Sequence, residues 1–146
     1  MKYLHSMVRV SDLEDSLDFY CNKMGLYEVN RFESIEGRFT LIFLSVDSEL
    51  DFNKSNDKPL IELTYNWDQT VYNKGDNFGH LAFSVENIYD FCERLIESGV
   101  VIKRPPRDGH MAFVSSPDDI SIEIIQEGER LVPIEPWLSM KNQGEW

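Results

Sequence analysis

The chain has 146 residues, enough for one domain with a hydrophobic core, and its 42% hydrophobic content is that of a folded protein. Its net charge of −12 argues against nucleic acid or an anionic membrane as partner, because both select basic surfaces. The sequence has no apolar run near the roughly 20 residues of a membrane span, no signal-peptide pattern, and two cysteines without motif spacing. We therefore expect a cytoplasmic protein.

The first half of the chain reads as a strand, a helix and three further strands. Residues 3–10 alternate in polarity, as a half-buried strand does. Ser11 and Glu14 then have the spacing of a capping box, which predicts the start of a helix that ends at Gly25. Strand patterns follow at 27–32, 39–46 and 60–67.

The same order of elements begins again at His80. A strand pattern is followed by a helix that Asn87 caps and Gly99 ends. Further strands are expected near 100–103, 111–115 and 121–126.

These two halves predict an internal repeat, because residues 5–13 and 80–88 have matching residue types at several corresponding positions when they are aligned without gaps. The expected fold is α+β, with tandem βαβββ modules that form a curved mixed sheet around a cleft. The modules are 1–67 and 78–126, within a single domain 1–126. The segment 127–146 is expected to be an extended tail that lies on the body of the protein or on a partner subunit.

Each module carries one histidine and one glutamate in mid-strand, on the side opposite the apolar residues. A carboxylate in an apolar strand is expensive to bury unless a proton or a cation compensates it. Taken singly, each residue is better explained as a core histidine or a solvated glutamate. At equivalent positions of a repeat, two imidazoles and two carboxylates favour a divalent-cation site. The predicted ligands are His5, Glu62, His80 and Glu123.

Two other features are candidates for anion binding. His110 ends the most basic run of the chain, KRPPRDGH at 103–110, which is either an ordinary surface loop or a flap made by Lys103, Arg104 and Arg107. Arg9 shares the face of His5, and an arginine in a cleft usually pairs with a carboxylate of protein or ligand.

The segments that carry a family resemblance are LHSMVRV (4–10), LDFYCNKMGL (17–26), IELTYNW (61–67), FGHLAFSV (78–85) and AFVSSPDDISIEII (112–125). Through them the chain resembles glyoxalase I enzymes of the vicinal oxygen chelate superfamily. All four metal-ligand positions of that family hold its His, Glu, His, Glu set. Related epimerases generally have Gln where this chain has Glu62. The chain departs from the family at Asp119, where glycine is usual.

The resemblance implies isomerisation of the methylglyoxal–glutathione hemithioacetal to S-lactoylglutathione through an enediolate that the metal stabilises, with glutathione as co-substrate. It implies that Glu123 moves the proton and that Glu62, its pseudo-symmetric twin, could serve the other hand of the substrate. It also implies one divalent metal per site, with nickel preferred and cobalt or zinc possible. A homodimer is expected, and the site is either shared between subunits or closed within one chain.

The same resemblance implies a set of substrate contacts. Arg9 and Asn66 match positions that hold the glutathione moiety, and the loop 103–111 matches the segment that covers its glycyl carboxylate. The substrate-binding residues expected in that loop are Arg107, His110 and Met111.

Two other functions are open on the sequence alone. One is a metal-dependent epimerase or isomerase that acts on another carbonyl or thioester compound. The other is a non-catalytic small-molecule binding protein of the same fold, which would have no need of four metal ligands.

Overall fold

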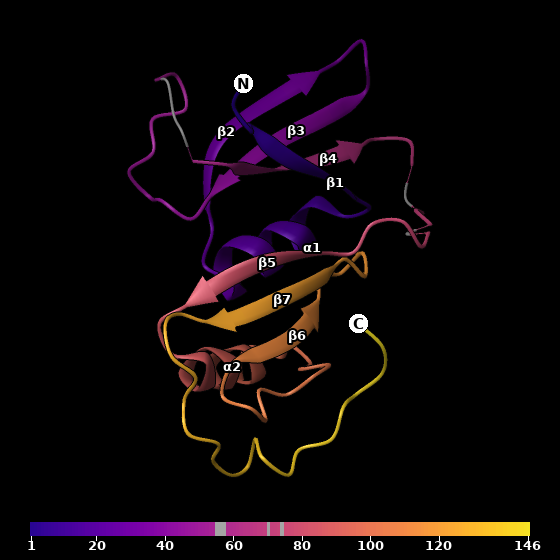
Figure 1. The fold of residues 1–146 in the computed structure, drawn as a ribbon. Helices are drawn as coiled ribbons and strands as arrows, with labels where there is room; N and C mark the ends of the chain where they lie inside the picture. Colours follow the sequence, from indigo (N-terminus) through magenta and orange to yellow (C-terminus); the bar gives the residue numbers. More distant parts are fainter. Residues whose placement is uncertain (55–57, 70, 74) are drawn as a thin grey trace. The chain divides into compact units, whose positions relative to one another are not determined.

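The computed structural model describes residues 1–146 except 55–57, 70 and 74. The chain forms two compact units, Met1–Asn73 and Lys74–Trp146 (Figure 1). Each unit is built on its own mixed sheet and contains few helices, which confirms the α+β class. The boundary between the units falls between the two predicted modules.

The first unit has a four-stranded sheet of order β1-β4-β3-β2, in which β1 is parallel to β4 and the other pairs are antiparallel. Alternation buries one side of this sheet, through residues such as Val8, Ile42 and Leu63, and leaves polar groups on the other. Its elements are β1 (His5–Val10), α1 (Leu13–Leu17), η1 (Asp18–Lys23), β2 (Tyr27–Ser34), β3 (Phe39–Ser45) and β4 (Leu60–Asn66).

The helical segment of the first unit begins differently from the prediction. The capping box of Ser11 and Glu14 is wrong, because the N-cap is Asp12, whose carboxylate accepts a hydrogen bond from the Asp15 amide at 2.9 Å. A carboxylate one residue later satisfies the same free amides of the first turn. The segment then changes to a π-helix in η1, and Gly25 follows it at φ +89°.

The second unit has a three-stranded sheet of order β5-β7-β6, in which β5 is parallel to β7 and β6 is antiparallel to it. The amphipathic helix α2 packs against β6 and β7 and buries Ile88, Cys92 and Leu95. The predicted cap is confirmed, since Asn87 accepts from the amides of Tyr89 and Asp90. The elements are β5 (His80–Val85), α2 (Ile88–Glu97), β6 (Met111–Ser115) and β7 (Ser121–Gln126).

The strand predicted near 100–103 does not form. A single bridge between Arg104 and Phe113 stands in its place, and the amides of Lys103 and Arg104 share the Phe113 carbonyl. Pro105 and Pro106 follow at once, and proline has no amide to continue a ladder.

The turn before β7 explains the departure at Asp119. This residue has φ +58°, in the left-handed region where glycine meets no Cβ penalty. Its amide donates to the Ser116 carbonyl at 2.9 Å, and aspartate tolerates this conformation better than most residues.

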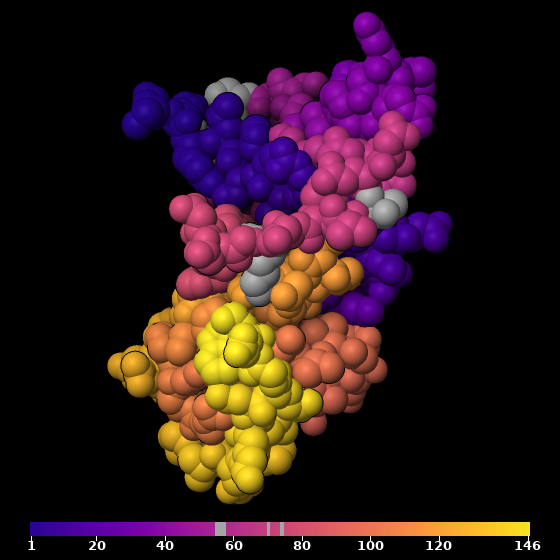
Figure 2. Space-filling model, turned by 90° about the vertical axis from the view of Figure 1, so that its right-hand side faces the viewer, coloured from indigo at the N-terminus to yellow at the C-terminus, as the bar shows by residue number. Residues whose placement is uncertain are grey.

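The tail 127–146 lies on the body of the second unit (Figure 2). Trp137 is 5% exposed and stacks on Tyr89, with ring centroids 6.1 Å apart. The Tyr89 hydroxyl donates to the Val132 carbonyl, and the amide of Leu131 donates to the carbonyl of Gly109 at 2.9 Å. The tail is therefore part of the packed structure of its unit.

Gly109 permits this close approach, and its replacement by alanine tests the attachment. A Cβ at Gly109 would lie 2.0 Å from the Leu131 carbonyl oxygen, and the residue has φ +65°. We expect Gly109→Ala to lower the free energy of unfolding by at least about 2 kcal/mol, measured by urea denaturation. Gly99→Ala is the matched control, because Gly99 has φ +83° but no atom within 4 Å of the added Cβ. Equal losses in the two variants would contradict a close contact with the tail.

Candidate functional site

The first unit places His5 beside Glu62 on the open side of its sheet. His5 begins β1 and Glu62 lies in the middle of β4, its parallel neighbour. The His5 Nε2 atom is 3.1 Å from Glu62 Oε2, and the two side chains are 36% and 13% exposed. The hydroxyl of Thr64 donates to the other oxygen, Glu62 Oε1, at 3.0 Å. Both carboxylate oxygens of Glu62 thus have a partner.

The second unit repeats this pair with His80 and Glu123. His80 begins β5, Glu123 lies in β7, and these strands are again parallel. His80 Nε2 is 3.0 Å from Glu123 Oε2, with side chains 42% and 16% exposed. Ile125 occupies the position that Thr64 has in the first unit, two residues after the glutamate. The Thr64 hydrogen bond is therefore not repeated.

Each pair also has a phenylalanine that the sequence reasoning did not identify. Phe43 pairs with Glu62 in the register of β3 and β4, and Phe113 pairs with Glu123 in that of β6 and β7. Each phenylalanine meets the histidine ring edge to face, at 5.7 Å in the first unit and 5.5 Å in the second. In the sequence, these residues could have been found as a phenylalanine in the strand that precedes each glutamate strand.

The donor set of each pair fits one half of a divalent-cation site. Two ligands that bind one cation at about 2.1 Å lie about 3.0 Å apart when they subtend a right angle. A neutral imidazole that donates to a carboxylate gives the same separation, so the distance alone does not decide. What favours a cation is the repetition of the pair, together with two largely buried carboxylates that need a compensating charge.

Each unit by itself supplies two of the four predicted ligands. Among the residues that the structure describes, no group of three or more His, Cys, Asp or Glu side chains is placed to hold a cation. The convergence of His5 and Glu62 with His80 and Glu123 on one ion stays a prediction.

The first unit has a pocket of about 320 Å³ beside its His–Glu pair. The ring of Phe52, from the segment between β3 and β4, lies 5.0 Å from that of Phe43 and forms part of the wall with His5. Two lysines lie at the pocket, and both form ion pairs, Lys54 with Asp51 and Lys58 with Asp47. The full lining is Leu4, His5, Phe43, Leu50, Phe52, Lys54, Lys58 and Leu60.

The two substrate contacts predicted in the first unit lie on or next to the sheet that carries Glu62. Arg9 is exposed on the same side of β1 as His5 and pairs in register with Thr64. Asn66 ends β4, and its amide nitrogen donates to the Tyr72 hydroxyl at 3.0 Å.

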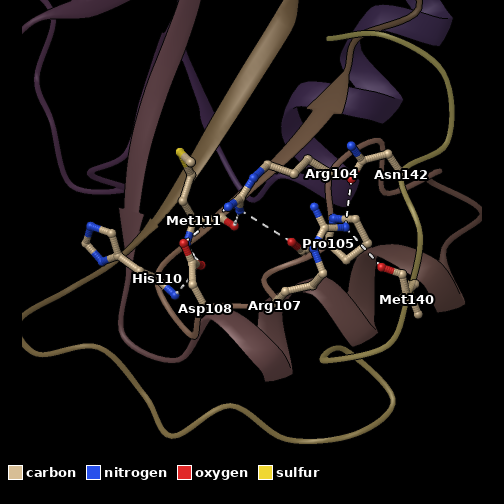
Figure 3. Close-up of polar contacts among 8 residues, drawn as sticks. All are labelled: Arg104, Pro105, Arg107, Asp108, His110, Met111, Met140 and Asn142. Carbon is tan, nitrogen blue, oxygen red and sulfur yellow. Dashed lines mark hydrogen bonds and ion pairs between the residues drawn. The ribbon is translucent and has the colours of Figure 1, made fainter.

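The basic loop 103–111 is organised around a carboxylate of its own (Figure 3). Asp108 accepts from Arg104 Nη2 at 3.2 Å and from the amides of His110 and Met111 at 3.1 and 3.2 Å. Burial acts to raise the pKa of Asp108, but these hydrogen bonds outweigh it and hold that pKa below its ordinary value. Arg104 also donates to the Met111 carbonyl.

The other charged group of this loop reaches the tail. Arg107 Nη1 donates to the Met140 carbonyl at 3.0 Å and to Asn142 Oδ1 at 2.8 Å (Figure 3). The His110 ring points away from the Arg104–Asp108 pair, and its Nδ1 is buried with no hydrogen-bond partner among the described residues (Figure 3).

The cysteines do not offer a nucleophile. Both are free, and burial raises the pKa of Cys21 and raises that of Cys92 to about 12. In the part of the chain that the structure describes, we also find no helix with the length and apolar character that membrane spanning requires.

Comparison with known proteins places these features in a family. A family model described as the glyoxalase/bleomycin resistance protein/dioxygenase superfamily matches residues 2–124. A lactoylglutathione lyase of Neisseria meningitidis is 41% identical over 87% of this chain and 91% of its own, and a probable lactoylglutathione lyase of Synechocystis sp. is 37% identical over 89% and 98%. The structure of the trypanothione-dependent glyoxalase I of Leishmania major matches with a TM-score of 0.77 and 33% identity, over 87% of both chains.

A titration with nickel tests the four-ligand site. We expect wild-type protein stripped of metal to bind one Ni²⁺ per chain, and His5→Ala and His80→Ala each to weaken binding by at least about tenfold, because each removes one ligand of the same ion. Isothermal titration calorimetry measures both quantities. His110→Ala, which removes the third histidine, is the control and should keep the wild-type affinity. Two ions per chain, or one histidine variant with unchanged affinity, would contradict a single site.

Proposed function

The chain belongs to the glyoxalase/bleomycin resistance protein/dioxygenase superfamily, and we propose that it is a metal-dependent lactoylglutathione lyase within that family. Its substrate is the hemithioacetal of methylglyoxal and glutathione, its product is S-lactoylglutathione, and its role is methylglyoxal detoxification. The observation that carries the proposal is the His–Glu pair found at 3.0–3.1 Å in both units. The relatives named lactoylglutathione lyase support the choice of reaction.

The reaction moves one proton between neighbouring carbons and a second proton from the hydroxyl oxygen on the first carbon to the carbonyl oxygen on the second, and no atoms are gained or lost. A C–H bond next to a carbonyl is a weak acid, so the negative charge that develops on the substrate oxygens needs stabilisation. A bound divalent cation supplies that stabilisation as a Lewis acid. His5, Glu62, His80 and Glu123 would hold it, and Glu123 would take the proton from the carbon that bears the sulfur and return it to the adjacent carbon.

The surroundings of the two glutamates support the choice of Glu123 as the base. Glu62 has one oxygen beside His5 and the other held by the Thr64 hydroxyl, which restrains its orientation. Glu123 has Ile125 at the equivalent position, and a purely hydrocarbon side chain cannot donate a hydrogen bond. Glu62 is suited to stay a fixed ligand, and Glu123 has an oxygen without that restraint.

The residues that bind the glutathione part of the substrate, away from the reacting carbons, are those that the family resemblance indicates. Arg9 and Asn66 hold the glutathione moiety, and Arg107, His110 and Met111 lie in the loop that covers its glycyl carboxylate. Arg107 and His110 differ in how readily each could bind that carboxylate. The Arg107 guanidinium already binds tail oxygens, whereas the Nδ1 of His110 has hydrogen-bonding capacity to offer within the described structure.

Three further assignments complete the proposal. Nickel is the preferred metal, since two nitrogens and two oxygens with places for water suit it, as they suit cobalt or zinc. The protein is a homodimer and is cytoplasmic.

The assay for the proposed base is the appearance of the thioester absorbance with methylglyoxal, glutathione and nickel. We expect Glu123→Gln to lower kcat by at least about 100-fold, because an amide cannot accept the proton, while nickel stays bound. Glu127→Gln removes an exposed carboxylate just beyond β7 and serves as the matched control.

Two results would count against these assignments. Full activity in Glu123→Gln would remove the proposed base. The absence of turnover in the wild-type chain with nickel, cobalt, zinc or manganese would remove the proposed function.

Substitution of Arg9 tests the glutathione contact. If Arg9 binds a carboxylate remote from the reacting carbons, Arg9→Ala should raise KM by about tenfold or more and change kcat little, because that contact is equally strong in substrate and transition state. Steady-state kinetics with varied hemithioacetal concentration measure both constants. Equal falls in kcat and kcat/KM would show that Arg9 acts on the reacting centre instead.

A further inference from the structure

The open side of the second sheet carries an aromatic residue that should be accessible but is buried. Phe113 shares a register row with Glu123 and Ala82, on the side that carries His80. Ala82 is exposed, yet Phe113 is 7% exposed. The ring that stacks on it is that of Trp146, the last residue of the chain, at 5.9 Å and 29°.

The tail holds Trp146 there through contacts close to the end of the chain. Arg107 binds Met140 and Asn142, and the amide of Gln143 donates to the Lys103 carbonyl at 2.8 Å. Trp137 anchors the start of this segment in the core. Only Gly144 and Glu145 separate the last of these bonds from Trp146, so the position of its ring is set by the unit and not by a free end.

The first unit contains the same arrangement, built from a different segment. There Phe52 lies on Phe43 as Trp146 lies on Phe113, and Phe43 meets His5 as Phe113 meets His80. Phe52 is part of the wall of the pocket next to His5. In both units a histidine is followed in space by a strand phenylalanine, and then by a second aromatic from a segment outside the strands.

We infer that Trp146 is a substrate-contacting residue that extends, through its stack on Phe113, the aromatic wall next to His80 and selects the substituent of the carbonyl substrate. The ring is 42% exposed, so it stacks on Phe113 and still offers surface to a ligand. Indole offers a large apolar area at little entropic cost and favours an aromatic or extended apolar substituent over a methyl group. The matched family segment ends at residue 124, so this wall belongs to the part of the chain beyond it. The inference rests on the proposed function for the identity of the substrate.

The first test compares two substrates in the nickel-loaded protein. We expect Trp146→Ala to lower kcat/KM for the phenylglyoxal hemithioacetal about threefold to tenfold more than for the methylglyoxal hemithioacetal. Trp146→Phe should restore most of this preference, because it keeps an aromatic ring. Leu138→Ala, which truncates an exposed apolar side chain elsewhere on the tail, should leave it unchanged. Equal effects of Trp146→Ala on both substrates, or no effect, would overturn the inference.

The second test does not depend on turnover. S-benzylglutathione is a thioether that cannot react, and its binding to the nickel-loaded chain can be followed by calorimetry and by tryptophan fluorescence. We expect its dissociation constant to rise about threefold to tenfold in Trp146→Ala, and the fluorescence response to be lost in Trp146→Phe but kept in Trp67→Phe. Binding that depends on Trp146 without turnover would remove the proposed function and leave the inference standing. Turnover by the wild-type chain, with unchanged thioether affinity in Trp146→Ala, would support the proposed function and overturn the inference about Trp146.

Discussion

Each glutamate lies next to its histidine because its strand is the parallel neighbour of the strand that carries the histidine. A parallel neighbour cannot be reached by a tight turn and requires a long connection. In the first unit, α1, η1, β2 and β3 form the connection between β1 and β4, and in the second, α2 and β6 lie between β5 and β7. The order of elements in each unit is therefore what brings its histidine to its glutamate, and the apolar side of each sheet stabilises that arrangement from behind.

The two units share the His–Glu pair and its strand phenylalanine, but the rest of the surroundings differs. The glutamates differ in the residue two positions on, Thr64 in one unit and Ile125 in the other, and a hydrogen bond to one carboxylate has no equivalent at its twin. The aromatic rings that lie on Phe43 and Phe113 also come from different segments. Phe52 comes from the segment between β3 and β4, and Trp146 comes from the tail. Such differences allow the two pairs, although alike in sequence position, to have unequal chemical tasks.

Period-two alternation and the repeat were enough to predict the sheets, the faces of their strands and both His–Glu pairs. The register between strands could not be predicted from the sequence, so the pairing of Phe43 with Glu62 and of Phe113 with Glu123 could not be predicted either. A phenylalanine in a strand also looks like an ordinary core residue. The capping box failed because Asp12 competes with Ser11 for the same amides. The strand near 100–103 failed because Pro105 and Pro106 end its ladder, and the tail has no periodicity from which its contacts could be inferred.

Residues 1 and 146 both lie close to a predicted metal ligand. Met1 is fully accessible and precedes β1, which opens with His5, while Trp146 is separated from His80 by one ring. A polyhistidine purification tag joined to residue 1 or residue 146 would bring extra imidazoles close to His5 or His80, and one joined to residue 146 would also crowd the indole. Metal content and stoichiometry are therefore properties to determine on protein from which every affinity tag has been cleaved.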